Sequence, residues 1–188
     1  MVEEIRKKIR RIYIHCSDSL WGDVGAITDW HVQRGFKTIG YHFVICNQFP
    51  FYLNLKENSP DESYDGKIQK GRDINEDGAH VADSWVKKNG NIPWADNEGT
   101  IAISLIGIDH FTSGQYYNLF WILQELLIAT GLNVENVWGH YEFYLNNGYP
   151  KLRTCPNIDM GWLRTKLSGE MARGQRGSEK DNFIARHG

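Results

Sequence analysis

The pattern of apolar and polar positions divides the chain into strand-like and helix-like segments. Arg11 to Cys16 is a short apolar run rich in β-branched residues, and Tyr41 to Cys46 is a second. Gly99 to Gly107 is rich in Ile and apolar on both faces, as expected of a strand at the centre of a covered sheet. Val134 to Trp138 is a further short run. These segments predict buried strands.

Other segments repeat apolar residues three and four positions apart, which is the spacing of a helix. Ala26 to Arg34 shows this spacing, with Asp23 or Thr28 as a possible cap. Gln115 to Thr130 shows it over a longer stretch, where Ser113 can cap the helix and the glycine that follows Thr130 can end it. The sequence therefore predicts helices in both segments.

The remaining stretches are shorter or more polar. Asn47 to Lys70 contains Pro and Gly turn signals and predicts a hairpin, or two short edge strands with a polar loop. Met160 to Leu167 predicts a last short helix. We expect a charged lead-in over residues 1–10, one domain over residues 11–168, and a disordered tail over residues 169–188, where apolar residues are few.

Strands that alternate with helices, around one strand apolar on both faces, indicate an α/β fold. We expect a single domain with a central mixed β-sheet flanked by helices. A length of 188 residues, with 41% hydrophobic and 23% charged residues, is typical of one globular domain.

Charge and cysteine content narrow the possible partners. A net charge of −2 makes nucleic acid an unexpected main partner. No stretch is apolar enough for a membrane span, and the N-terminus lacks the apolar core of a secretory signal peptide. Three cysteines argue against a disulfide framework. We expect a monomer made in the cytoplasm of the producing cell.

Three residues carry candidate metal chemistry. His15 ends the first apolar run, His140 follows the run at Val134 to Trp138, and Cys155 lies on a loop rich in proline. Two imidazoles and a thiolate suit Zn²⁺, and three protein ligands leave a coordination position for water, as in catalytic zinc sites. For each residue taken alone, an ordinary buried or hydrogen-bonded side chain is the simpler interpretation. If the three converge, the sequence predicts a hydrolase with one zinc ion.

A set of short segments, in a fixed order along the chain, resembles one known family. The segments are Trp30 to Phe36, Ile39 to Ile45, Gly71-Arg72 with Gly78-Ala79-His80, Ile103 to Gly107, Gly139-His140, and Thr154-Cys155-Pro156. The chain resembles the zinc-dependent N-acetylmuramoyl-L-alanine amidases of the type 2 family, which includes a phage lysozyme and the peptidoglycan recognition proteins. The resemblance covers about residues 11 to 165.

The resemblance implies an activity and a ligand set. The family's zinc ligands correspond to His15, His140 and Cys155. The implied reaction is cleavage of the amide between N-acetylmuramic acid and the L-alanine of the stem peptide in peptidoglycan or muropeptides. Zinc would activate water for attack and polarise the scissile carbonyl.

The resemblance also suggests two catalytic residues. Tyr41 matches a family tyrosine that lines the zinc site and assists the water or the intermediate; otherwise it is an aromatic core residue. Arg153 stands where the phage enzyme has a lysine. Arginine keeps the positive charge but stays protonated, so we assign Arg153 to electrostatic stabilisation rather than proton donation. Its alternative is a solvated surface arginine.

Further residues have weaker assignments. By resemblance His80 lies at the rim of the substrate groove, and Trp94 could stack on a sugar, although covering the sheet is the simpler role for it. His42 is adjacent to Tyr41 in a strand and so points to the opposite face, which predicts a structural role. Glu142 could orient a ligand or, more simply, cap a helix or pair on the surface. Cys16 is expected to face away from His15.

Several functions remain open. The leading one is an endolysin-type peptidoglycan hydrolase. A cytoplasmic amidase that recycles muropeptides fits equally well with the absence of a signal peptide. A non-catalytic peptidoglycan-binding receptor is a different class, disfavoured because all three ligands are present. A regulator that binds another protein is a further class, suggested only by the basic lead-in.

Overall fold

The computed structural model describes residues 5, 8–81, 96–148 and 154–187, with side chains as far as residue 173. In this part of the chain five strands form one sheet in the order β3-β2-β4-β1-β5. Four strands are parallel and β3 runs antiparallel to β2. The single domain with a mixed sheet is thus confirmed. The strands are β1 (Arg11–Cys16), β2 (Phe43–Ile45), β3 (Ile68–Lys70), β4 (Thr100–Leu105) and β5 (Val137–Gly139).

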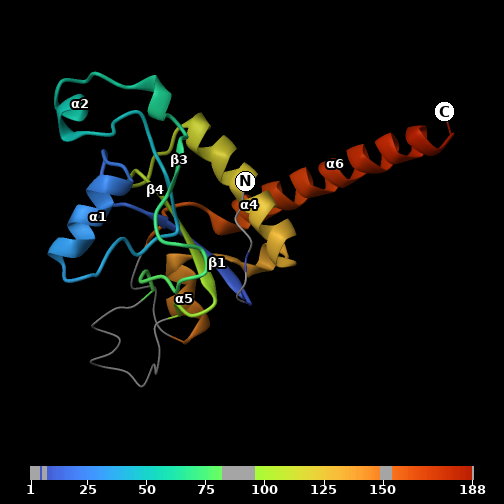
Figure 1. Ribbon diagram of the computed structural model, residues 1–188, viewed down its shortest axis with the longest axis horizontal. Coiled ribbons are helices and arrows are strands. Elements are labelled where there is room, and N and C mark those ends of the chain that lie inside the picture. The colour runs from blue at the N-terminus through green and yellow to red at the C-terminus, as the bar shows by residue number, and fades with distance from the viewer. Residues whose placement is uncertain (1–4, 6–7, 82–95, 149–153, 188) are drawn as a thin grey trace.

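Helices cover both faces of this sheet, with α1 and α4 on opposite sides of it (Figure 1). Two short 3-10 turns, Glu62–Tyr64 and Val134–Asn136, complete the described elements. The helices are α1 (Val24–Gln33), α2 (Tyr52–Lys56), α4 (Ser113–Thr130), α5 (His140–Asn146) and α6 (Met160–His187). Within the described ranges, none of them is long and apolar enough to cross a membrane.

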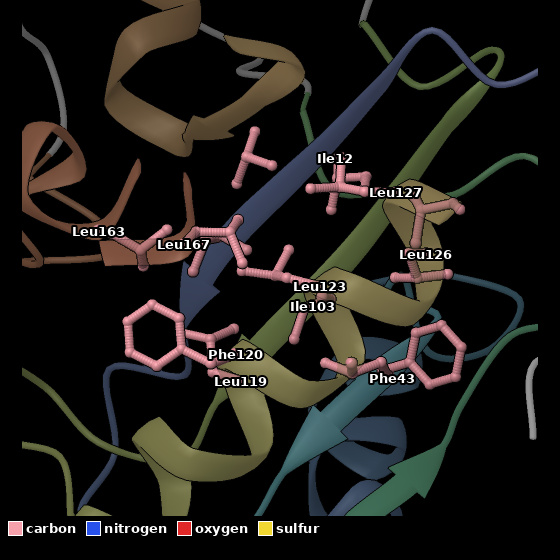
Figure 2. Close-up of a cluster of buried hydrophobic side chains, with 14 of the residues drawn as sticks. Ile12, Phe43, Ile103, Leu119, Phe120, Leu123, Leu126, Leu127, Leu163 and Leu167 are labelled. Atoms are coloured by element: carbon pink, nitrogen blue, oxygen red, sulfur yellow. The ribbon is translucent and has the colours of Figure 1, made fainter. Parts of the chain in front are cut away.

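One face of the sheet carries the larger core. Alternate residues of β1, such as Ile12, point toward α4 and α6, together with Ile103 of the central strand β4. Figure 2 shows these side chains packed against Leu123 of α4 and Leu163 of α6. Ile9, assigned to the lead-in, is also buried in this core, so the packed domain begins slightly earlier than expected.

The opposite face carries the alternate residues of the same strands. Tyr13 of β1 packs with Phe143 and Tyr144 of α5, while Val44 of β2 packs with Ile27 of α1. His15 belongs to this face, because it follows Tyr13 by two positions. The fold therefore directs His15 toward the side of the sheet that α1 and α5 cover.

Two helix starts show how local chemistry sets the boundaries. Asp23 caps α1 by accepting a hydrogen bond from the backbone N–H of Ala26, one of the two predicted caps. Thr112, rather than the predicted Ser113, caps α4 in a reciprocal capping box with Gln115. Gln115 also donates hydrogen bonds to the carbonyls of Ile45 and Ile106, which ties the start of α4 to the ends of β2 and β4.

Other parts differ from the sequence prediction. The segment from Asn47 to Lys70 contains one edge strand, β3, and its connection to β2 includes α2 and a 3-10 turn. The run at Val134 to Trp138 begins as a 3-10 turn before β5. Helix α5 was not predicted, because it is short and begins at a residue assigned to a metal.

The last helix is longer than predicted. It begins at Met160 as expected but continues to His187, where the sequence predicted a disordered tail. Nine of the 20 residues at positions 169–188 are Arg, Glu, Ala, Gln or Lys, which favour helices, although four others are glycines. The low apolar content on which the prediction rested argues only against packing in the core. Figure 1 shows the far end of α6 projecting from the rest of the fold.

Candidate metal centre

Two neighbouring parallel strands bring two histidines together. His15 lies near the carboxyl end of β1, and His140 follows β5 directly as the first residue of α5. Because β1 and β5 are paired in parallel, their carboxyl ends lie at the same edge of the sheet. The centroids of the two imidazole rings are 4.6 Å apart.

Cys155 approaches this pair from the loop before α6. Its Sγ atom lies 3.8 Å from Nδ1 of His15 and accepts a hydrogen bond of 3.2 Å from the backbone N–H of Cys16. The carbonyl of Cys155 accepts a hydrogen bond of 3.0 Å from the backbone N–H of Tyr141. These bonds hold the loop against both strand ends.

The glycine before His140 permits this close approach. A Cβ atom at Gly139 would lie 2.8 Å from Cδ of Pro156 and 2.9 Å from Cγ of Met160. Any larger residue would push the segment after Cys155 away from His140. The Gly-His pair in the sequence therefore has a packing reason.

The three side chains fit a zinc ion in size and chemistry. One possible ligand atom from each of His15, His140 and Cys155 lies within 4.8 Å of the others. Tetrahedral zinc, with bonds of about 2.0–2.3 Å, separates its ligands by about 3.5 Å. Burial, followed by the imidazoles of His140 and His80, holds the pKa of His15 well below its ordinary value. His15 is therefore neutral and can offer a lone pair to a metal.

The cluster borders a cavity of about 740 Å³. Three cationic residues, Arg34, Lys37 and Arg72, line it together with Asp18 and Asn157. The sequence analysis did not assign Arg34 and Lys37 to the site. The available signal was that Arg34 lies inside the segment Trp30 to Phe36, which carried the family resemblance, and that Lys37 directly follows this segment. The excess of positive charge suits a ligand with carboxylates.

Tyr41 lies beside the cluster. The centroid of its ring is 5.0 Å from that of His15 and 5.2 Å from that of His31, and it lines the same cavity. Burial raises the pKa of Tyr41, and the nearby thiols of Cys155 and Cys16 add to the effect. The phenol is therefore protonated at neutral pH and can donate a hydrogen bond.

His80 is more deeply placed than predicted. Only 8% of its surface is exposed, and its Nδ1 atom lies 3.1 Å from Nε2 of His15. It contributes to the cavity lining, but it lies against a candidate ligand rather than at the rim of the groove. The resemblance identified the residue as part of the site, whereas its position depends on how the loop before β4 folds around it.

Two further histidine and carboxylate predictions can be placed. His42 accepts a hydrogen bond at Nδ1 from the backbone N–H of Ala102 and donates from Nε2 to the carbonyl of Glu76, each at 3.0 Å. This is the structural role expected of it. Glu142 accepts a hydrogen bond from the backbone N–H of Gly139 and forms an ion pair with Arg164, as the capping and pairing alternative predicted.

The prediction for Cys16 was wrong. Cys16 lines the same cavity as Cys155, and the hydrogen bond between these two side chains lowers the pKa of Cys16. The alternation of a strand stops applying at this point, because β1 ends at Cys16 and Asp18 adopts a positive φ of 58°. Arg153 and Trp94, by contrast, lie outside the described residues.

Comparison with known proteins extends this picture. The chain is 32% identical over 176 residues to an endolysin of Klebsiella phage KP32, covering 86% of this chain and 91% of that protein. It is 27% identical over 184 residues to an endolysin of Enterobacteria phage K11, covering 92% and 95% of the two chains. No family model matches the sequence.

The fold has solved counterparts. The N-acetylmuramoyl-L-alanine amidase LysC from Clostridium intestinale URNW has a TM-score of 0.60 to this structure at 21% sequence identity, with 86% of each chain covered. This protein, with a cluster of two histidines and one cysteine at one edge of its mixed sheet, therefore has the fold of N-acetylmuramoyl-L-alanine amidases. The identity to the Klebsiella phage protein, over most of both chains, shows that the chain belongs to the endolysins.

Proposed function

We propose that this chain is a zinc-dependent N-acetylmuramoyl-L-alanine amidase that cleaves the amide between N-acetylmuramic acid and L-alanine in peptidoglycan. One observation carries the proposal: His15, His140 and Cys155 converge within 4.8 Å beside an accessible cavity. These residues would hold one zinc ion. When bound, zinc supplies a Lewis acid that polarises the scissile carbonyl and lowers the pKa of a water molecule.

Tyr41 supplies the second chemical group. Its phenol is protonated, lines the cavity, and lies next to the ring of His15. Attack on the amide carbonyl places negative charge on the carbonyl oxygen, and a neutral O–H donor stabilises that charge without a proton transfer. Arg153 remains a proposed second stabilising group on the grounds of its position in the sequence.

The cavity lining supports an acidic peptide ligand. Arg34 and Lys37 face the same cavity as the ligand cluster and are not among the residues with a carboxylate ion pair in the described part of the chain. Stem peptides of peptidoglycan carry free carboxylates, which these cations can bind. We also propose peptidoglycan as the partner, action as a monomer, and access to the wall after release from the producing cell. The endolysin relatives support the first and the last of these.

Identification of the products tests the proposal. Purified peptidoglycan incubated with the protein should yield new L-alanine amino termini and intact glycan strands. New reducing sugar ends, with no L-alanine termini, would indicate glycan cleavage and contradict it. Sedimentation with peptidoglycan without any cleavage would favour the receptor-like binding module. Parallel incubation with soluble muropeptides distinguishes a recycling amidase, which would prefer them to intact wall.

A further inference from the structure

A series of hydrogen bonds leads from His15 through His80 to Thr100 at the start of β4. Nε2 of His15 lies 3.1 Å from Nδ1 of His80, and Nε2 of His80 lies 3.1 Å from Oγ1 of Thr100. The Thr100 hydroxyl is 2.9 Å from the carbonyl of Asn97 and 3.1 Å from the carbonyl of Asp96. His15, His80 and Thr100 are all buried, so water does not compete for these bonds.

The carbonyl groups at the end of this series of hydrogen bonds determine which atom donates and which accepts in each bond. A carbonyl only accepts, so the Thr100 hydroxyl donates toward Asn97 and Asp96 and leaves its oxygen to accept from Nε2–H of His80. Nδ1 of His80 then carries no proton and accepts from Nε2–H of His15. Nδ1 of His15 is thereby left as a lone pair, and it is the nitrogen that lies 3.8 Å from Sγ of Cys155.

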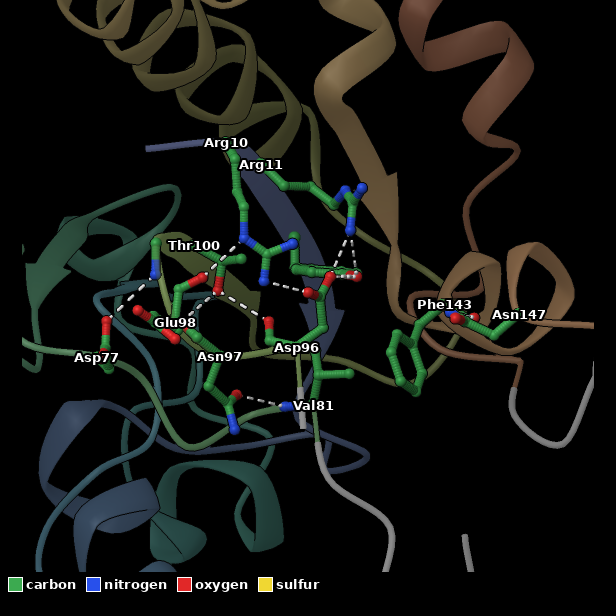
Figure 3. A network of polar contacts seen from close by, with 12 residues as sticks. Arg10, Arg11, Asp77, Val81, Asp96, Asn97, Glu98, Thr100, Phe143 and Asn147 are labelled. Atoms are coloured by element: carbon green, nitrogen blue, oxygen red, sulfur yellow. Dashed lines mark hydrogen bonds and ion pairs between the residues drawn. The ribbon is translucent and has the colours of Figure 1, made fainter. Parts of the chain in front are cut away.

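The surroundings of His80 hold its ring in this orientation. Oδ1 of Asn97 accepts hydrogen bonds from the backbone N–H groups of His80 and Val81, at 3.0 and 2.9 Å. Figure 3 shows the bond between Asn97 and Val81, with Thr100 and Asp96 nearby. The ring of Tyr13 lies 5.5 Å from that of His80. A Cβ atom at Gly78 would lie 2.4 Å from Cδ2 of His80, so the glycine leaves room for the imidazole.

We propose that His80 is a positioning residue that fixes the tautomer and the ring orientation of His15, so that Nδ1 of His15 faces the metal. The inference rests on the proposed zinc site. His80 acts through His15 and does not itself contact the zinc ion or the scissile bond. Hydrogen-bonding partners behind a metal-bound histidine typically change metal affinity by about 10–100-fold when they are removed.

The test compares variants that keep or remove one acceptor. In His80→Asn the side-chain oxygen can occupy the place of Nδ1 and accept from His15, whereas His80→Leu offers no acceptor. Thr100→Val leaves His80 in place but removes the group that sets its tautomer, and Thr100→Ser retains that group. His42→Asn is the matched control, because His42 is also buried but its ring nitrogens bond to the backbone groups of Ala102 and Glu76 instead of to a candidate ligand.

The readout is zinc affinity, measured by competition with a chromogenic chelator, with the visible spectrum of the Co²⁺-substituted protein as a second measure of ligand geometry. We expect His80→Leu to weaken zinc binding by about 10–100-fold. Thr100→Val should weaken it less, and His80→Asn, Thr100→Ser and His42→Asn should stay close to the wild type. The Co²⁺ spectrum should change in His80→Leu alone among the His80 variants.

Equal losses in His80→Asn and His80→Leu would overturn the inference, because the retained acceptor would then have no effect. Unchanged zinc affinity in both Thr100→Val and His80→Leu would also overturn it. If His80→Leu does not fold, the comparison of Thr100→Val with Thr100→Ser decides. Failure of the proposed function is distinct, since it appears as absence of zinc binding or of amide cleavage in the wild type itself.

Discussion

The backbone N–H of Cys16 donates a hydrogen bond of 3.2 Å to the Sγ atom of Cys155. A backbone donor directed at sulfur stabilises the thiolate, which is the form that binds metal. Cys46 provides the contrast within the same chain, because burial raises the pKa of its thiol to about 12. The two cysteines thus lie in different surroundings, and Cys155 is the one suited to bind zinc.

This contrast predicts the effect of removing each thiol. Cys155→Ala should weaken zinc binding by more than about 100-fold, beyond the range typical for loss of a partner behind a ligand. Cys46→Ala is the matched control and should retain the affinity of the wild type. Titration of both variants with zinc against a competing chelator measures the difference. Equal affinities in the two variants would exclude Cys155 as a ligand.

Loss of the Tyr41 hydroxyl should slow catalysis and leave metal binding intact. Tyr41→Phe keeps the ring beside His15 but removes the donor that we assign to the carbonyl oxygen. We expect kcat to fall by about 10²–10³-fold, as is typical when one such donor is lost. Zinc content should remain that of the wild type. A variant that keeps full kcat would show that Tyr41 serves only as part of the lining.

The ion pair between Glu142 and Arg164 should contribute to stability. The guanidinium contacts both carboxylate oxygens, at 2.9 and 3.0 Å, and joins the start of α5 to α6. Glu142→Gln leaves Arg164 half-buried without its charged partner, so the free energy of unfolding should fall by about 2 kcal/mol. Urea denaturation measures this change.

Glu57→Gln serves as its control, because Glu57 is exposed and lies in a different part of the fold from Arg164. Its free energy of unfolding should stay within about 0.5 kcal/mol of the wild type. Equal effects of the two substitutions would mean that the ion pair adds nothing beyond surface charge.

His31 should make stability depend on pH. Burial, with smaller effects of Arg34 and Arg72, lowers the pKa of His31 to about 4 from an ordinary value of 6.5. Its Nδ1 atom accepts a hydrogen bond from the backbone N–H of Gly40, which requires the unprotonated ring. Below pH 6.5 the unfolded chain binds a proton that the folded chain does not, so the contribution of His31 is complete above pH 6.5 and is lost as pH falls toward 4.

The measurement is the urea midpoint of wild type and His31→Asn between these pH values, at one fixed zinc concentration. Asparagine can still accept from Gly40 but does not titrate, so the variant should lose less stability on acidification than the wild type. The other histidines titrate in both proteins and cancel in the comparison. Parallel pH profiles would show that His31 makes no contribution.

Much of the fold could be predicted from the patterns of apolar residues within short stretches of the sequence. The central strand β4 has apolar residues on both faces, and α4 has helical spacing with a glycine after it, so each is evident from a local stretch. Helix α5 is short and bears His140, and the length of α6 depends on helix propensity without a continuous apolar face. Neither gives a strong periodic signal.

The residues of the site likewise divide into those that the sequence identified and those whose roles depend on the fold. His15, His140 and Cys155 are residue types that bind zinc, and the sequence analysis identified them as a set. The roles of His80 and Cys16 depend on contacts across the fold. Asn97 contacts His80 from the loop before β4 and Thr100 contacts it from the first position of β4, while Cys16 lies against Cys155 where β1 ends. Such contacts have no signature within a single stretch of sequence.

Reconstitution of the metal-free protein tests the central claim most directly. The protein is stripped with a chelator, dialysed, and titrated with zinc while the release of L-alanine amino termini from purified peptidoglycan is followed. We expect no release from the stripped protein and a linear return of activity that reaches its maximum at one equivalent of zinc. Full activity in the stripped protein, or none at any zinc concentration, would contradict the assignment of a zinc amidase.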